Sequence, residues 1–133
     1  MLARPFRVLI TLWAGSLWSV VWVAAALFRY VGDRHTAGFI AARLFSVETY
    51  LGLAVAALAL LLPNRVRFRL GFIAVALLAF NEWILKRVMS AAQAHGSALG
   101  LGFGAWHGVS AALYILACLC VLIMVYKDEY RHV

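Results

Sequence analysis

Four long apolar runs dominate this sequence and restrict the folds that it can adopt. A helix that crosses a bilayer needs roughly 20 predominantly apolar residues. Four segments meet that requirement, at residues 8–30, 44–62, 68–85 and 103–126. Irregular backbone and open sheet edges are not tolerated against lipid, so such runs predict α-helices. We therefore expect an all-α fold: an integral membrane four-helix bundle in which residues 1–133 form a single transmembrane domain.

The composition favours lipid over water as the surrounding medium. The chain has 133 residues, of which 66% are hydrophobic and only 13% charged. A soluble domain of this length exposes a large surface relative to its core, and so few charges cannot cover it. The lipid bilayer is therefore the first partner that we expect.

The net charge of +7 would suggest a nucleic-acid partner if the protein were soluble. Here, however, the cations stand at the ends of the apolar runs, where they can extend to phospholipid headgroups. No segment outside the runs is long enough to build a contiguous basic face. We therefore expect no nucleic-acid partner.

The distribution of Lys and Arg predicts an orientation. Four crossings place both termini on one side, and cytoplasmic loops are enriched in these residues. The side of the termini holds seven of them: Arg4, Arg7, Arg65, Arg67, Arg69, Lys127 and Arg131. The opposite side holds five: Arg29, Arg34, Arg43, Lys86 and Arg87. The bias places both termini in the cytoplasm, although dual topology stays open because the margin is small.

Small residues recur every four positions in the last run. Gly100, Gly104, Gly108 and Ala112 would lie along one helical face, and the second run has Gly52 and Ala56 at the same spacing. Small side chains allow close approach of membrane helices. We expect these faces to pack against helices, either of this chain or of partners in a homo-oligomer or a hetero-complex.

Three ionisable side chains lie inside the runs: Glu48, Glu82 and His107. Such residues are costly in a membrane and are functional-site candidates by default. Because successive helices alternate in direction, all three fall in the same half of the bilayer, the outer half in the predicted orientation. That half also faces the two loops that carry His35 and His95. The convergence predicts one polar site there.

Three polar neighbours extend this candidate site. Asn81 precedes Glu82, while Ser110 and Tyr114 follow His107 at i+3 and i+7, on the same face of the helix.

Each ionisable residue also has a structural interpretation. Glu82 precedes Lys86 by four residues, the favourable order for an ion pair on a helix. Glu48 shares a face with Gly52, which directs it into the bundle, where it could bond a neighbouring helix. His107 could be a packed histidine whose ring bonds a backbone carbonyl.

Short motifs along the chain resemble a known family. They are Leu12–Trp18, Ala42–Phe45, Asn81–Trp83 and Trp106–Ser110. The pattern resembles the bacterial domain-of-unknown-function 4149 proteins, which are similar to transmembrane protein 205. More distantly, the fold resembles the membrane domains of copper-resistance D-type proteins and a four-helix haem-associated oxidase family. The resemblance implies a bacterial inner-membrane protein of unestablished activity.

Three hypotheses of function follow from these residues. The first is a protein that binds copper, zinc or haem iron, with His107 as the central ligand and Glu48 or Glu82 beside it, since imidazole and carboxylate suit these metals. The second is a structural or accessory subunit whose small-residue faces bind partner helices. The third is a small proton-coupled transporter that uses Glu48 and His107. The sequence has no HExxH motif and no Ser-His-Asp set, so we do not expect a soluble-type enzyme.

Overall fold

The computed structural model describes residues 4–62 and 68–130, and the regular elements in those ranges are all helical. The all-α prediction is therefore confirmed. The elements are α1 (Arg4–Tyr30), α2 (Arg34–Leu60), α3 (Arg69–Phe80), the π-helical turn η2 (Asn81–Leu85), α4 (Lys86–His95) and α5 (Phe103–Tyr130).

Three helices, α1, α2 and α5, are long and apolar enough to cross a membrane, which suggests a membrane protein. The remaining predicted span, residues 68–85, corresponds to α3 continued by η2. The helical path then runs on through α4 to His95, so the third run extends well past its apolar part. Helix α2 likewise begins at Arg34, ahead of the apolar run that starts at residue 44.

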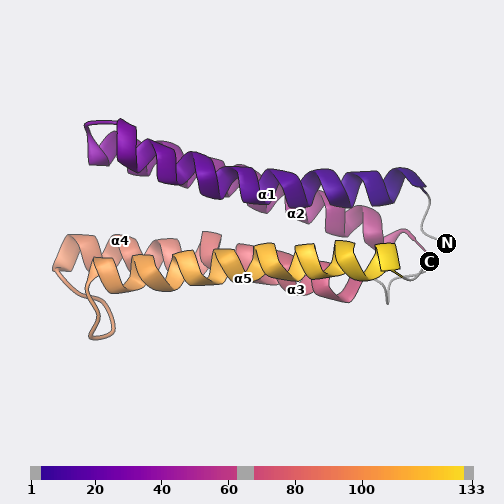
Figure 1. Cartoon of the computed structure of the whole chain (residues 1–133). Helices are drawn as coiled ribbons and strands as arrows, with labels where there is room; N and C mark the ends of the chain where they lie inside the picture. Colours follow the sequence, from indigo (N-terminus) through magenta and orange to yellow (C-terminus); the bar gives the residue numbers. More distant parts are fainter. Residues whose placement is uncertain (1–3, 63–67, 131–133) are drawn as a thin grey trace.

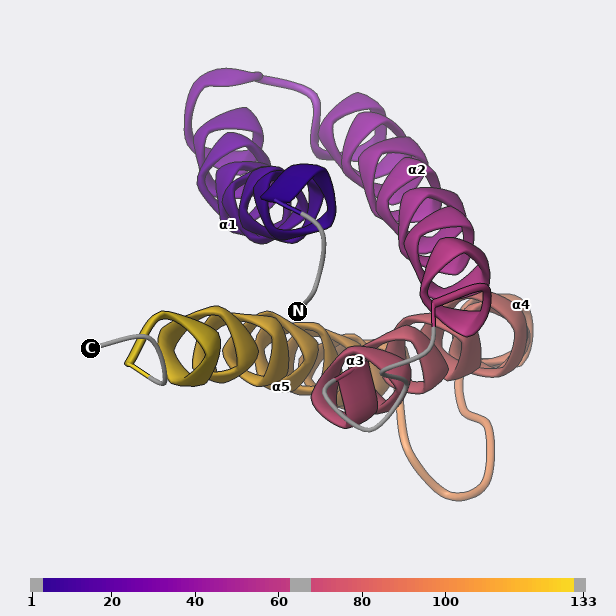
Figure 2. The same ribbon diagram turned by 90° about the vertical axis from the view of Figure 1, so that its right-hand side faces the viewer.

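The helices form two antiparallel pairs (Figure 1). One pair is α1 with α2, and the other is α5 with the α3–α4 run. Helix α1 begins and α5 ends at the same end of the bundle, whereas the two pairs diverge toward the loops at the other end (Figures 1 and 2). Three cations of the charge argument, Arg65, Arg67 and Arg131, lie outside the described residues.

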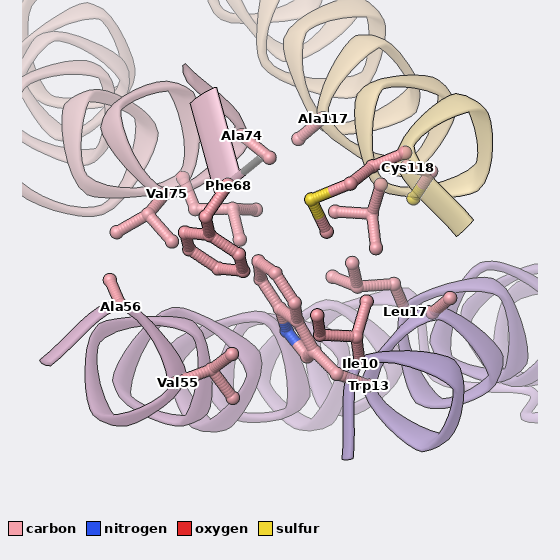
Figure 3. Packing of buried hydrophobic residues seen from close by; sticks show 14 of the residues in the cluster. Ile10, Trp13, Leu17, Val55, Ala56, Phe68, Ala74, Val75, Ala117 and Cys118 are labelled. Atoms are coloured by element: carbon pink, nitrogen blue, oxygen red, sulfur yellow. The ribbon is translucent and has the colours of Figure 1, made fainter. Parts of the chain in front are cut away.

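The apolar core joins the two pairs in the half where α1 begins and α5 ends. The Trp13 indole lies between the pairs beside Phe68, with 6.4 Å between ring centroids (Figure 3). Leu17 of α1 and Cys118 of α5 are completely buried next to them. In a lipid environment this packing stabilises the bundle mainly through dispersion contacts, because lipid tails are as apolar as the core.

The outer surface is also apolar. Leu12 is 66% exposed and Trp22 is 73% exposed, both on α1. A helix that is apolar on all sides is typical of a membrane span or of the core of a much larger protein. This surface accords with the lipid environment predicted from the composition.

The small-residue faces do not behave alike. Gly52 is buried, and a Cβ at this position would lie 2.8 Å from the Trp13 ring, so close approach is confirmed for α2. In α5, by contrast, Gly104 and Gly108 are exposed, and a Cβ on either would meet no atom within 4 Å. Gly100 lies outside α5, in the preceding loop, with φ of +80°. The prediction that this face of α5 packs against another helix of the same chain is therefore wrong.

Candidate functional site

The Glu48 carboxyl links the first two helices. It is only 4% exposed, and one of its oxygens accepts a hydrogen bond from the Ser16 hydroxyl of α1. The other oxygen has no hydrogen-bond partner among the described residues. The inward orientation predicted from the shared face with Gly52 is thus confirmed.

Glu82 links η2 to α2 together with Lys86. The Lys86 ammonium lies 2.6 Å from Glu82 Oε2, and it donates a 2.6 Å bond to the Ser46 hydroxyl of α2. Ser46 Oγ lies 2.9 Å from Glu82 Oε1. Lys86 also reaches the backbone carbonyl of Ala42, at 3.4 Å. The predicted ion pair between Glu82 and Lys86 is confirmed, and both of its residues also bond the Ser46 hydroxyl of α2.

Asn81 and Ser110 form a reciprocal pair between η2 and α5. The Ser110 hydroxyl donates to Asn81 Oδ1 at 2.6 Å, and Asn81 Nδ2 donates to the Ser110 carbonyl at 3.1 Å. Although Asn81 and Glu82 are adjacent in the chain, Asn81 bonds to α5 whereas Glu82 bonds to α2. Within the π-helical turn, the Lys86 N–H bonds to the Asn81 carbonyl. This wider turn inserts one residue into the helix, so that α3 and α4 can both direct side chains at the rest of the bundle.

Tyr114 links α5 back to α1. Its buried hydroxyl donates a 3.1 Å bond to the backbone carbonyl of Leu17. Its ring packs edge-on against Phe45 of α2, with 4.6 Å between centroids. Tyr114 therefore touches both helices of the opposite pair.

Together these contacts form a closed ring around the bundle, which we call the polar belt. Its links run from α1 to α2, from α2 to η2, from η2 to α5 and from α5 to α1. Its members are Ser16, the Leu17 carbonyl, Ser46, Glu48, Asn81, Glu82, Lys86, Ser110 and Tyr114. Hydrogen bonds across helices fix their relative register in a membrane.

His107 stands apart from the polar belt. It is exposed on the first turns of α5, near the loop end, and its ring contacts Phe28 of α1 and stacks on Phe103, at centroid distances of 6.5 and 6.0 Å. No hydrogen-bond chain among the described residues links it to Glu48. His35 and His95 are also exposed, at the start of α2 and at the end of α4.

This arrangement does not fit the metal hypothesis. Residues 4–62 and 68–127 contain no group of three or more His, Cys, Asp or Glu side chains that could hold a metal ion. Each of Glu48 and Glu82 instead has a separate partner on a different helix. The structure thus places five of the six predicted site residues in the polar belt and leaves His107 outside it. The five are Glu48, Asn81, Glu82, Ser110 and Tyr114.

Two members of the belt were not predicted, Ser16 and Ser46. A hydroxyl in an apolar run has no pattern of its own, because it can equally bond its own helix, as Ser19 does to the Gly15 carbonyl. The available signal was their position. That signal holds for Ser46, which stands two residues before Glu48, and not for Ser16, which lies near the middle of the first apolar run.

Comparison with known proteins identifies one match. A family model described as Domain of unknown function (DUF4149) matches residues 8–127. No curated protein and no solved structure matches the chain. The more distant resemblances, to transmembrane protein 205 and to copper-resistance proteins, therefore stay predictions.

Proposed function

Because the chain belongs to the DUF4149 family, whose domain has no known function, we propose its role from its geometry. It is a structural or accessory membrane protein that binds a transmembrane helix of a second copy or of another protein. The polar belt holds its own four helical runs in register, and the outward face of α5 receives the partner.

One observation supports this role above the others. The outward face of α5 carries Gly104, Gly108 and Ala112, all exposed, while Ala117 and Val121 further along the helix are completely buried on its inward side. Contacts within the chain do not explain the glycines, since a Cβ at Gly104 or Gly108 would meet nothing. A small-xxx-small face that is free within the chain is typical of helix association in membranes.

The proposed placement is the bacterial inner membrane with both termini in the cytoplasm. It is supported by the three long apolar helices, by the start of α1 and the end of α5 at one end of the bundle and by the balance of Lys and Arg. The fourth crossing would be made by α3 and η2.

Site-directed photo-crosslinking in the native membrane tests the partner. A photoreactive residue at Ala105, beside the small-residue face, should give a protein–protein adduct that Gly108→Leu abolishes. The same residue at Ala54, exposed on α2, is the matched control and should give only lipid adducts. Lipid adducts alone at both positions would overturn the proposal.

The metal hypothesis is decided by a separate measurement on the same protein. Its remaining support is the buried Glu48 oxygen without a partner among the described residues. Protein purified in nanodiscs without chelators would be assayed for bound metal and for a haem absorption band, beside the variants Glu48→Gln and His107→Ala. Stoichiometric copper, zinc or haem iron that disappears in either variant would restore this hypothesis.

A further inference from the structure

Three cations stand at, or one residue from, the contact between Lys86 and α2. The Lys86 ammonium approaches the Ala42 carbonyl at 3.4 Å, so the two helices are neighbours at this level. Arg43 and Arg87 come directly after these two residues in the sequence, and both are exposed. We call Arg43, Lys86 and Arg87 the cationic seam.

The charges of the cationic seam are only partly compensated. Glu82 pairs with Lys86, as described above. Neither Arg43 nor Arg87 has a carboxylate partner in the part of the chain that the structure describes. Of the three cations only Lys86 is paired with a carboxylate among the described residues, and the two arginines remain available to an anion from outside the chain.

Arg43 is held in an orientation suited to such an anion. Its guanidinium lies 5.2 Å from the centroid of the Phe39 ring, one helical turn nearer the loop end. Phe39 is 57% exposed, so the stacked pair lies on the outer surface of α2. Stacking occupies the planar face of the guanidinium and leaves the N–H groups at its edge free, and these match the oxygens of a phosphate.

The depth of the cationic seam agrees with a headgroup ligand. The apolar run of α2 begins at residue 44, and that of the third helical run ends at residue 85. The seam residues therefore stand at the edge of the hydrocarbon on both helices. Phospholipid phosphates are the anions found at that level, and basic pockets between membrane helices bind anionic headgroups.

We propose that the cationic seam binds the headgroup phosphate of an anionic phospholipid, with Arg43 and Arg87 as its ligands. A zwitterionic lipid is a poorer ligand because its choline or ethanolamine cation opposes the two arginines. The proposal rests on the membrane placement given above but not on the partner-binding role of α5.

Lipid selectivity tests this proposal. The full chain would be reconstituted in mixed phosphatidylglycerol–phosphatidylcholine bilayers, and association of spin-labelled lipids of each class would be measured. Each basic residue near an anionic surface contributes roughly fivefold in affinity. The wild type should therefore prefer phosphatidylglycerol by roughly 5- to 25-fold, and Arg43→Gln with Arg87→Gln should reduce the preference to near that of the bulk lipid.

Two controls make the result specific. Arg34→Gln removes an exposed cation from the start of α2, nine residues from Arg43, and should leave the preference unchanged. Arg43→Lys with Arg87→Lys keeps the charge and should retain most of the preference for phosphatidylglycerol. Equal binding of both lipids by the wild type, or a preference that survives the double Gln substitution, would overturn the proposal. Failure to reconstitute in any bilayer would instead refute the membrane placement itself.

Discussion

The bond from the Ser110 hydroxyl to Asn81 Oδ1 is the polar-belt contact whose energy can be isolated most cleanly, because Ser110→Ala removes this bond and keeps the backbone carbonyl that accepts from Asn81 Nδ2. Interhelical hydrogen bonds in membrane proteins contribute about 0.6 kcal/mol on average and up to about 1.7. A double-mutant cycle of Asn81→Ala and Ser110→Ala should give a coupling energy in that range. It would be measured by equilibrium unfolding in mixed micelles, followed by circular dichroism.

A second cycle serves as the control for this prediction. Asn81 and Ser46 belong to different links of the belt, so the effects of Asn81→Ala and Ser46→Ala should add within about 0.5 kcal/mol. Additive effects in the Asn81–Ser110 cycle would show that the bond between the Ser110 hydroxyl and Asn81 contributes nothing to stability.

At the same scale, the sequence allowed some contacts to be predicted and not others. The orientation of Glu48 followed from its helical face, and the Glu82–Lys86 pair followed from i+4 spacing, because both depend only on the geometry of one helix. The partners Ser16 and Ser46 could not be predicted, since they depend on the rotation of one helix against another. The convergence of His107 with the two glutamates failed as a ligand set for the same reason: equal depth does not imply contact.

Among the elements, α2 has an N-terminal cap that makes its stability depend on pH. The Asp33 carboxylate accepts hydrogen bonds from the Thr36 hydroxyl and from the backbone N–H groups of His35 and Thr36. These bonds, with that of the Thr36 hydroxyl the largest cause, hold the pKa of Asp33 below its usual value. The folded pKa is lowered, so the contribution is complete above the usual pKa and is lost as the pH falls through the lowered value.

Asp33→Asn tests this cap, because asparagine also caps helices but does not titrate in this range. The unfolding free energy of the wild type should fall relative to that of the variant as the pH is lowered from about 5 to about 2. Parallel pH profiles for the two proteins would contradict the assignment.

The packing of α2 against α1 and α3 depends on the absence of a side chain at Gly52. An added Cβ would lie 2.8 Å from Trp13 Cζ2 and 3.3 Å from Val75 Cγ2. Overpacking of this kind costs about 1–3 kcal/mol, so Gly52→Ala should lower the unfolding free energy by that amount. Gly108→Ala on α5 is the matched control: it meets no atom, so it should not lower the unfolding free energy, and the higher helix propensity of alanine should raise it by up to about 1 kcal/mol. Equal effects at the two glycines would refute the close approach.

For the molecule as a whole, the sequence predicted the class of fold and the shared end of the termini, since both follow from the length, number and polarity of the apolar runs. It did not predict the π-helical turn at Asn81–Leu85, because such a turn depends on what the two halves of the helix must contact. It also did not predict that the helix pairs diverge toward the loops (Figure 1). The separation of the two helix pairs depends on the side chains that pack between helices, and the hydrophobic pattern along a single helix does not reveal these contacts.

Two links of the polar belt connect one helix pair with the other: Ser46–Glu82 and Tyr114–Leu17. Because the ring is closed, either link should hold the pairs when the other is cut. Ser46→Ala leaves only the long 3.4 Å bond from Lys86 to the Ala42 carbonyl in the first link, and Tyr114→Phe removes the second. Each single variant should therefore leave the loop-end separation unchanged, while the double variant should broaden it. Pulsed electron paramagnetic resonance between spin labels at positions 32 and 102 would measure this separation, after both native cysteines are replaced by alanine.

The control for this experiment removes hydroxyls that bond within a single helix. Thr11 and Ser19 each donate to a carbonyl four residues earlier in α1, so Thr11→Ala with Ser19→Ala deletes two hydrogen bonds without cutting the belt. Its distance distribution should match that of the wild type. If the double belt variant also kept the wild-type distribution, the apolar core around Trp13 and Phe68 alone would determine how far the pairs diverge. A broadening in either single variant would show that the links act independently rather than as a ring.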